Sequence, residues 1–154
     1  MKDKNEALKF AMKLISLRKR SAFEIKKRLE KKKFEENIIE EILQKLKSYK
    51  YLNDEEFAEA YINDRINFNP RGRFLIKKEL NEKGIAENII EKKIEELLSE
   101  KKEIELARKS AEKKLKTINN KTDKIKINQK IMSYLQSKGY SFDIINLVVN
   151  NEMQ

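Results

Sequence analysis

Residues 76–94 read IKKELNEKGIAENIIEKKI, and the spacing of the apolar side chains in this stretch decides the fold class. Ile76 and Leu80 lie four residues apart, a spacing that places both side chains on one face of an α-helix. The following step, from Leu80 to Ile85, is five residues and contains Gly84, a residue type that commonly ends a helix in the left-handed conformation. The stretch therefore predicts two amphipathic helices joined by a short turn.

The same spacing occurs twice more, in residues 25–43 (IKKRLEKKKFEENIIEEIL) and 131–149 (IMSYLQSKGYSFDIINLVV). Before each copy, another amphipathic segment carries an apolar residue followed by Ala, at Phe10-Ala11, Phe57-Ala58 and Leu106-Ala107. Self-similarity of this kind is typical of tandem repeats, and an apolar content of 39% suits a thin array. We expect an all-α protein, an elongated curved array of three tandem three-helix repeats, with repeats at 1–52, 53–99 and 100–154.

Capping signals set the expected ends of the helices. Ser21 and Asn53 each precede a Glu by three residues, which is the spacing of a capping box, and Ser141 can cap the last helix. The junction near Ser99 contains no Gly or Pro, so the sequence leaves open whether the helices on either side are continuous. The expected helices span 5–18, 22–32, 35–49, 54–68, 72–82, 86–99, 103–118, 124–137 and 141–151.

Missing residue types restrict the chemistry of this 154-residue chain. It has no Cys and no His, which removes disulfides, thiolate metal sites, most zinc sites and the commonest general base. Three Gly residues cannot form a Walker A loop or a dinucleotide fingerprint. The N-terminus is too polar for a secretory signal, and no apolar run approaches the roughly 18–20 residues that span a bilayer. We expect a cytoplasmic protein that is not an enzyme and has no catalytic residue, cofactor or metal ion.

The charge is strongly basic and unevenly distributed. Lys and Arg total 36 against 26 Asp and Glu, a net charge of +10, which favours a polyanion or an acidic protein groove as partner. Residues 1–52 carry sixteen cations and eight anions, residues 53–99 eight and eleven, and residues 100–154 twelve and seven. A genomic bias toward Lys, Ile and Asn stays open as an alternative, although uniform drift does not readily explain an acidic centre.

Three clusters of cations are the candidate nucleic-acid or filament-binding residues. The first forms a ridge on the expected second helix and the loop before it: Arg18, Arg20, Lys26, Lys27, Arg28 and Lys31. The second flanks Gly72, where two guanidinium groups could make bidentate phosphate contacts: Arg71, Arg73, Lys77 and Lys78. The third adjoins a polar connector at about 117–123: Arg108, Lys109, Lys113 and Lys130. Each cluster suits phosphate contact, but a solvated helix face would have the same composition.

Two further features are interpreted as structural. Arg65 shares a helix face with Tyr61 and could bury its stem and pair with a carboxylate such as Asp54 or Asp64, or it could point at a partner; the structural role is the favoured expectation. Aromatic residues could stack on bases, but core packing is the favoured expectation for Tyr49, Tyr51, Tyr61, Phe68, Phe74 and Tyr134.

Four segments together resemble the RecX family. They are LISLRKRS at 14–21, YLNDEEFA at 51–58 with Tyr61 and Arg65, Gly72, and KKELNEKGI at 77–85. The resemblance runs from about Ala7 to Val149 and is strongest over 11–98. This sequence departs from the family pattern in three places: Asn53 stands where Asp is usual, Lys33-Phe34 lacks the usual Gly, and Pro70 precedes Arg71-Gly72.

The resemblance implies a regulatory protein that binds the RecA recombinase filament on single-stranded DNA. It implies inhibition of the filament's recombination and ATPase activities, and thereby modulation of DNA repair and of the SOS response. It also implies a monomer that contacts single-stranded DNA, that can contact double-stranded DNA non-specifically, and that has no membrane partner. The alternative is a free-standing helical DNA-binding protein without a recombinase partner, which would bind duplex DNA with sequence preference.

Overall fold

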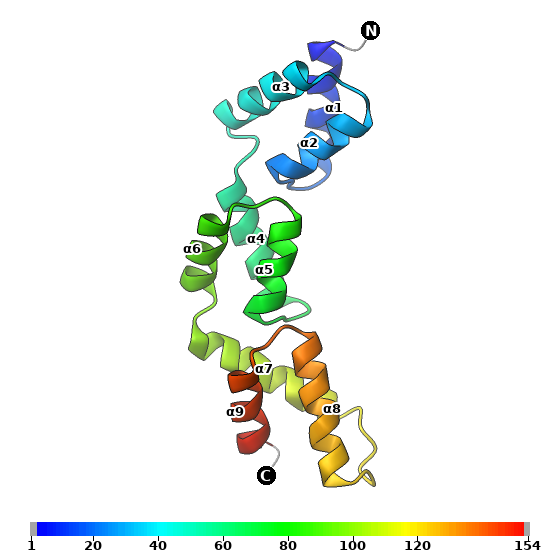
Figure 1. Cartoon of the computed structure of the whole chain (residues 1–154), viewed down its shortest axis with the longest axis vertical. Helices are drawn as coiled ribbons and strands as arrows, with labels where there is room; N and C mark the ends of the chain where they lie inside the picture. The colour runs from blue at the N-terminus through cyan, green and yellow to red at the C-terminus, as the bar shows by residue number, and fades with distance from the viewer. Residues whose placement is uncertain (1–2, 153–154) are drawn as a thin grey trace. The chain divides into compact units, whose positions relative to one another are not determined.

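The computed structural model describes residues 3–152, and within this range the chain is helical and contains no strand (Figure 1). The helices are α1 (Lys4–Leu17), α2 (Ala22–Lys31), α3 (Glu36–Ser48), α4 (Asp54–Asn67), α5 (Arg73–Glu82), α6 (Glu87–Leu97), α7 (Glu100–Leu115), α8 (Lys124–Ser137) and α9 (Phe142–Glu152). The predicted all-α class is confirmed, and the predicted helix ends lie within about three residues of these bounds.

Side-chain caps explain where several helices begin. Ser21 forms the expected capping box, because its hydroxyl accepts from the Glu24 amide while the Glu24 carboxylate accepts from the Ser21 amide. Asn53 Oδ1 accepts from two amides of the first turn of α4, at 3.0 and 3.2 Å. Ser99 caps α7 by accepting from the Lys102 amide, so α6 and α7 are separate helices although neither Gly nor Pro divides them.

The turn between the second and third helices has one backbone conformation in all three copies. Lys33, Gly84 and Gly139 have φ values of 71°, 78° and 88°, in the left-handed region that favours glycine. A Cβ on Gly84 would lie 2.2 Å from the Phe23 Cβ, and one on Gly139 would lie 2.4 Å from the Leu75 Cβ. Lys33 is exposed, so its side chain extends into solvent and the turn geometry survives without glycine.

The apolar positions that define the repeat form the buried core. In the first copy α1, α2 and α3 enclose Ala11, Ile25, Leu29, Ile39 and Leu43, each less than one-tenth exposed. The third copy buries the corresponding residues of α7, α8 and α9: Ala107, Ile131, Leu135, Ile145 and Val149. The Ala of each copy has no exposed surface, and in the first and third copies it lies on a helix, α1 or α7, that packs against the other two helices of its repeat.

By contacts between Cα atoms the chain divides into two compact units, Met1–Ala60 with Leu80–Ile90, and Tyr61–Glu79 with Glu91–Gln154. The boundary between the units passes through α4, α5 and α6. One end of each of these helices therefore belongs to a unit with α1–α3, and the other end belongs to a unit with α7–α9.

Candidate functional site

In the first unit, the start of α2 meets the turn between α5 and α6. The Ser21 hydroxyl donates to the Lys83 carbonyl at 2.7 Å, and the Ala22 amide donates to Asp54 Oδ1 at 3.0 Å. Phe23 lies directly over Gly84, where any Cβ would collide with its ring. Asp54 of the second repeat thus accepts from the first amide of α2 in the first repeat, in addition to the cap that Ser21 provides for that helix.

In the second unit, the start of α5 meets the turn between α8 and α9 in the same way. The Gly72 amide donates to the Lys138 carbonyl at 2.8 Å, and the Phe74 amide donates to the Gly139 carbonyl at 3.2 Å. The Arg73 amide donates to Glu103 Oε2 at 2.8 Å. A Cβ on Gly72 would lie 2.4 Å from the Gly139 carbonyl oxygen, so only glycine allows this approach of two backbones.

The two contacts are equivalent by sequence position, and we name the acceptors Asp54 and Glu103 the joint carboxylates. Asp54 stands four residues before Ala58, and Glu103 stands four residues before Ala107. Each accepts from the amide of the first residue of a second helix, Ala22 or Arg73. Sequence reasoning missed this role, although an acidic residue four before the repeated Ala in the second and third copies was the available signal.

The second cation cluster, near Gly72, is largely committed to internal ion pairs. Arg71 pairs with Glu79, and both side chains are four-fifths buried. Arg73 Nε lies 2.9 Å from Glu103 Oε1, and the same guanidinium donates to the Leu98 carbonyl at 3.1 Å. Glu103 is only 1% exposed, so Arg73 neutralises a buried carboxylate. Reversing either arginine to Glu would therefore place two carboxylates side by side in a buried or half-buried position and destabilise the fold.

Lys77 and Lys78 complete that cluster and differ in exposure. Lys77 is half-buried on α5, whereas Lys78 is exposed. Neither has an ion pair within the residues that the structure describes. Contact with an anion stays a prediction for the whole cluster, and Lys78 is the member best exposed to make it.

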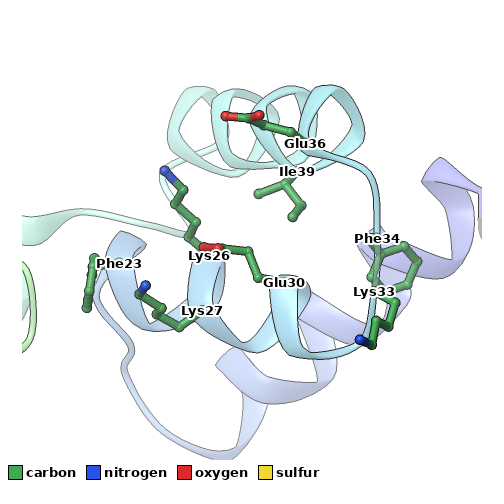
Figure 2. Close-up of a pocket in the computed structure, with 8 residues that line it drawn as sticks. All are labelled: Phe23, Lys26, Lys27, Glu30, Lys33, Phe34, Glu36 and Ile39. Carbon is green, nitrogen blue, oxygen red and sulfur yellow. The ribbon is translucent and has the colours of Figure 1, made fainter.

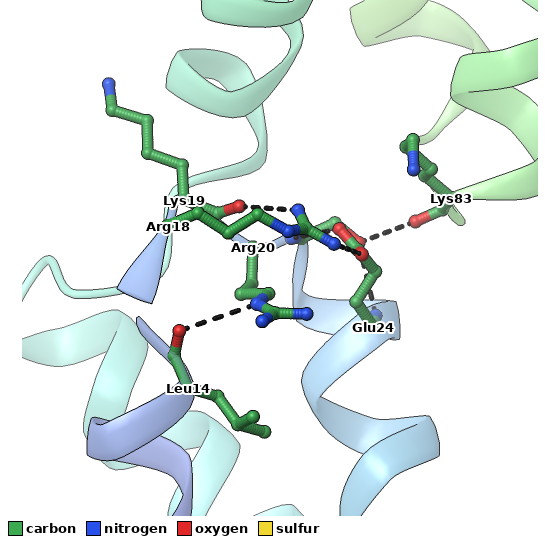
Figure 3. A network of polar contacts seen from close by, with 7 residues as sticks. Leu14, Arg18, Lys19, Arg20, Glu24 and Lys83 are labelled. Carbon is green, nitrogen blue, oxygen red and sulfur yellow. Dashed lines mark hydrogen bonds and ion pairs between the residues drawn. The ribbon is translucent and has the colours of Figure 1, made fainter. Parts of the chain in front are cut away.

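In the first cation cluster, the two arginines of the α1–α2 loop have internal partners (Figure 3). Arg18 pairs with Glu24 at 2.7 Å and also donates to the Lys19 carbonyl, while Arg20 Nε donates to the Leu14 carbonyl at 3.4 Å. Burial raises the pKa of the Glu24 carboxyl, but hydrogen bonds from Arg18 and the Ser21 backbone outweigh it and hold this pKa below its ordinary value.

The remaining cations of the first cluster face outward from α2. Lys27, Arg28 and Lys31 are exposed, and no ion pair holds them within the described part of the chain. Lys26 is half-buried and only 4.0 Å from Glu40, at the limit of an ion pair. We name Lys27, Arg28 and Lys31 the α2 cation triad.

A groove of about 530 Å³ lies between α2 and α3, and Lys27 is the member of this triad that lines it (Figure 2). Lys27 Nζ lies 5.1 Å from the centroid of the Phe23 ring, so one wall combines a cation with an aromatic face. The groove is mixed in charge, and it is lined by Phe23, Lys26, Lys27, Glu30, Lys33, Phe34, Glu36 and Ile39.

The third cluster lies on α7 and α8, with members that differ in burial. Arg108 is half-buried and has internal contacts. Lys109, Lys113 and Lys130 are exposed, without an ion pair to any residue that the structure describes. The three lysines could therefore meet an external anion without breaking an internal contact.

Arg65 is structural, but its partner differs from the expected one. Its guanidinium lies 5.2 Å from the centroid of the Tyr61 ring, and the side chain is half-buried. It forms no ion pair with Asp54 or Asp64; Asp54 instead accepts from the Ala22 amide. The expected carboxylate pairing was therefore wrong, because the neighbouring helix brought Asp54 to another donor.

The expected core packing of aromatic residues was wrong for four of them. Tyr61 and Tyr134 are half-buried, but the exposed fractions of the other side chains are 61%, 51%, 71% and 57% for Tyr49, Tyr51, Phe68 and Phe74.

Within the described residues, no group of three or more Asp and Glu side chains could hold a metal ion. No described helix is both long enough and apolar enough to cross a bilayer.

The repeated helices and their joints define a class of protein built from tandem three-helix domains, and the comparisons agree. The first, second and third three-helix domains of RecX match residues 7–46, 53–94 and 100–149. Regulatory protein RecX of Clostridium perfringens strain SM101 is 40% identical over 157 residues, which cover 99% of this chain and 71% of that protein. Regulatory protein RecX of Bacillus subtilis is 36% identical over 146 residues, 95% of this chain and 53% of that protein.

A solved structure supports the same conclusion. The crystal structure of RecX from Lactobacillus salivarius superposes with a TM-score of 0.85 at 29% sequence identity, over 96% of this chain and 94% of that one. This chain belongs to the RecX family. The predicted three-helix repeats and the resemblance drawn from the sequence are thereby confirmed.

Proposed function

We propose that this protein binds a RecA recombinase filament on single-stranded DNA and inhibits its recombination and ATPase activities, modulating DNA repair and the SOS response. In this proposal it acts as a cytoplasmic monomer whose repeats span 1–52, 53–99 and 100–154. The observation that carries the proposal is that all three RecX domains match this chain. The relatives that it resembles over nearly its whole length are called regulatory proteins. The absence of His and Cys supports a binding role over catalysis.

The α2 cation triad is the leading candidate for the contact with the filament. Its three side chains are exposed on one short helix, in a region where cations outnumber anions two to one. Exposed Lys and Arg that have no internal ion pair lose little when they meet phosphate, whereas Arg71 and Arg73 would have to leave Glu79 and Glu103. Lys78, Lys109, Lys113 and Lys130 are the further candidates that remain exposed.

The decisive experiment measures ATP hydrolysis by the recombinase on single-stranded DNA while this protein is titrated in. We expect the hydrolysis rate to fall with increasing protein. Duplex binding with sequence preference, together with an unchanged hydrolysis rate, would instead support the free-standing DNA-binding alternative.

The surface is tested by reversing the α2 cation triad to Glu (K27E, R28E, K31E). Inhibition should require at least tenfold more protein, while the unfolding temperature changes little because these side chains are exposed. The matched control reverses three exposed lysines of α7 and its C-terminal cap (K101E, K102E, K116E), with the same change in net charge. Equal loss of inhibition in both variants would mean that net charge, and not the α2 surface, determines binding.

A further inference from the structure

Two tyrosines stand on the surface at the end of α3, held there by the backbone. Tyr49 is the C-terminal cap of α3, and its amide donates to the Lys45 carbonyl at 3.1 Å. The chain then turns through Lys50, at φ 64°, and the Tyr51 amide donates to the Leu46 carbonyl at 2.9 Å. Because these hydrogen bonds close the turn, the backbone places the two tyrosines next to each other on the surface.

The rings are exposed and meet at an angle. Their centroids are 6.4 Å apart with an interplanar angle of 67°, and more than half of each side chain is open to solvent. Together with Leu8, Met12 and Leu46 they line a groove of about 330 Å³, which is large enough for a small flat ligand. Leu46 is buried and Leu8 and Met12 are partly buried, so the core forms the floor of this groove, while the two exposed tyrosine rings add an apolar surface that a partner can contact.

Five exposed lysines stand close in sequence to the residues that line this groove. Residues 45–50 contain Lys45, Lys47 and Lys50 and no carboxylate, and all three lysines are exposed. On α1, Lys9 and Lys13 directly follow the groove residues Leu8 and Met12 and are also exposed. Proteins that bind single strands combine a cationic track for phosphates with aromatic faces for bases, and this groove has both.

We propose that the groove of Tyr49 and Tyr51 binds an unstacked base of single-stranded DNA, while the surrounding lysines contact the adjoining phosphates. This inference rests on the proposed function, in which the protein works on a DNA strand, and adds a direct contact with its bases. An apolar segment of a partner protein is the other conceivable occupant, but five neighbouring lysines favour a polyanion.

The test compares a labelled oligothymidylate with an abasic strand of equal length, by fluorescence anisotropy and without any recombinase. The unmodified protein should bind the strand with bases roughly tenfold or more tightly, since stacking contributes on that scale for each base. Replacing both rings (Y49A, Y51A) should abolish this difference and leave the salt dependence of binding unchanged, because the salt dependence reports phosphate contacts. The Phe pair (Y49F, Y51F) keeps the ring faces and should retain the preference.

The control is F68A, which removes an aromatic ring that lies outside the groove and is more exposed than either tyrosine, and it should keep the full preference. Equal binding of both strands by the unmodified protein, or a full preference in the Ala pair, overturns the inference. So does a loss of recombinase inhibition in the Ala pair with unchanged strand binding, because a protein would then occupy the groove. If the Ala pair does not fold, the affinities of the unmodified protein for the two strands still test whether bases contribute to binding. Failure to inhibit recombinase ATPase contradicts only the proposed function, since the strand assay contains no recombinase.

Discussion

At the scale of single residues, Lys33 shows how the fold tolerates a departure from the family pattern. Its φ of 71° is the conformation that Gly84 and Gly139 adopt in the other two copies. Those glycines are required because Phe23 and Leu75 occupy the space of a Cβ. At Lys33 the side chain extends into solvent, so the only cost of a residue with a Cβ is the strain of the left-handed backbone conformation. The turn therefore keeps its geometry although glycine is absent.

Replacing Lys33 with Gly should therefore raise the free energy of unfolding by roughly 1 kcal/mol. The left-handed conformation costs about 1–2 kcal/mol for a residue with a Cβ, and glycine removes this cost. Part of the gain is offset because glycine increases the conformational entropy of the unfolded chain. Urea unfolding followed by circular dichroism measures the change. Lys27→Gly, inside α2, is the control and should destabilise by about 1 kcal/mol. A lower stability for Lys33→Gly would show that its side chain makes a contact worth more than the strain.

Tyr140 gives the protein a stability change at alkaline pH. Burial raises the pKa of its phenol from 10.0 to about 12; Ser110 opposes this shift, and Glu103 reinforces it. The folded state therefore favours the neutral phenol, and its contribution is complete below pH 10 and lost as the pH rises toward 12. Tyr140→Phe should remove this part of the pH dependence, measured as the free energy of unfolding between pH 9 and 12. Identical pH profiles for both proteins would contradict the assignment.

At the scale of elements, the joint carboxylates explain how neighbouring repeats attach to each other. Each accepts from the first amide of a helix in the preceding repeat, where the helix dipole favours an anion. The glycine turns complete the contact by allowing close approach of the backbone. The repeats are therefore joined by polar contacts at defined atoms as well as by apolar packing.

Glu103→Gln should lower the free energy of unfolding strongly, by about 3–5 kcal/mol. The substitution removes the buried negative charge of Glu103 and leaves the positive charge of Arg73 without its ion-pair partner. Asp54→Asn should cost only about 1 kcal/mol, because Asp54 is half-buried and the amide oxygen can still accept from Ala22. Urea unfolding compares the two variants. Equal and small losses would show that the Arg73 ion pair adds nothing beyond the hydrogen bond from the backbone.

At the scale of the whole molecule, the two compact units divide a chain that has three sequence repeats. Each unit contains one joint, Asp54 with Ala22 in the first and Glu103 with Arg73 in the second. The helices of the central repeat contribute to both units, so mutations there affect contacts with both neighbouring repeats. Of the two arginine ion pairs of the central repeat, Arg73 with Glu103 joins it to the third repeat, whereas Arg71 with Glu79 lies within it.

The net charge of +10 predicts binding to single-stranded DNA that weakens steeply with salt. Neutralising the α2 cation triad (K27Q, R28Q, K31Q) should lower the slope of log affinity against log salt by about 2, if all three side chains contact phosphate. Anisotropy titrations at several salt concentrations measure the slope. An unchanged slope would assign the triad to a protein contact and not to DNA.

The sequence by itself determined the helices, the three copies and the family, because apolar side chains four residues apart specify a helix face through local geometry alone. The same periodicity identified the buried Ala, Ile and Leu positions. Only the tertiary structure decided which cations stay available: Arg73 meets Glu103 thirty residues away, while Lys27 and Arg28 meet no carboxylate in the described chain. It also showed that Tyr49 and Tyr51, at the end of α3, lie on the surface. Contacts between distant segments depend on how helices pack, and no local pattern in the chain records that packing.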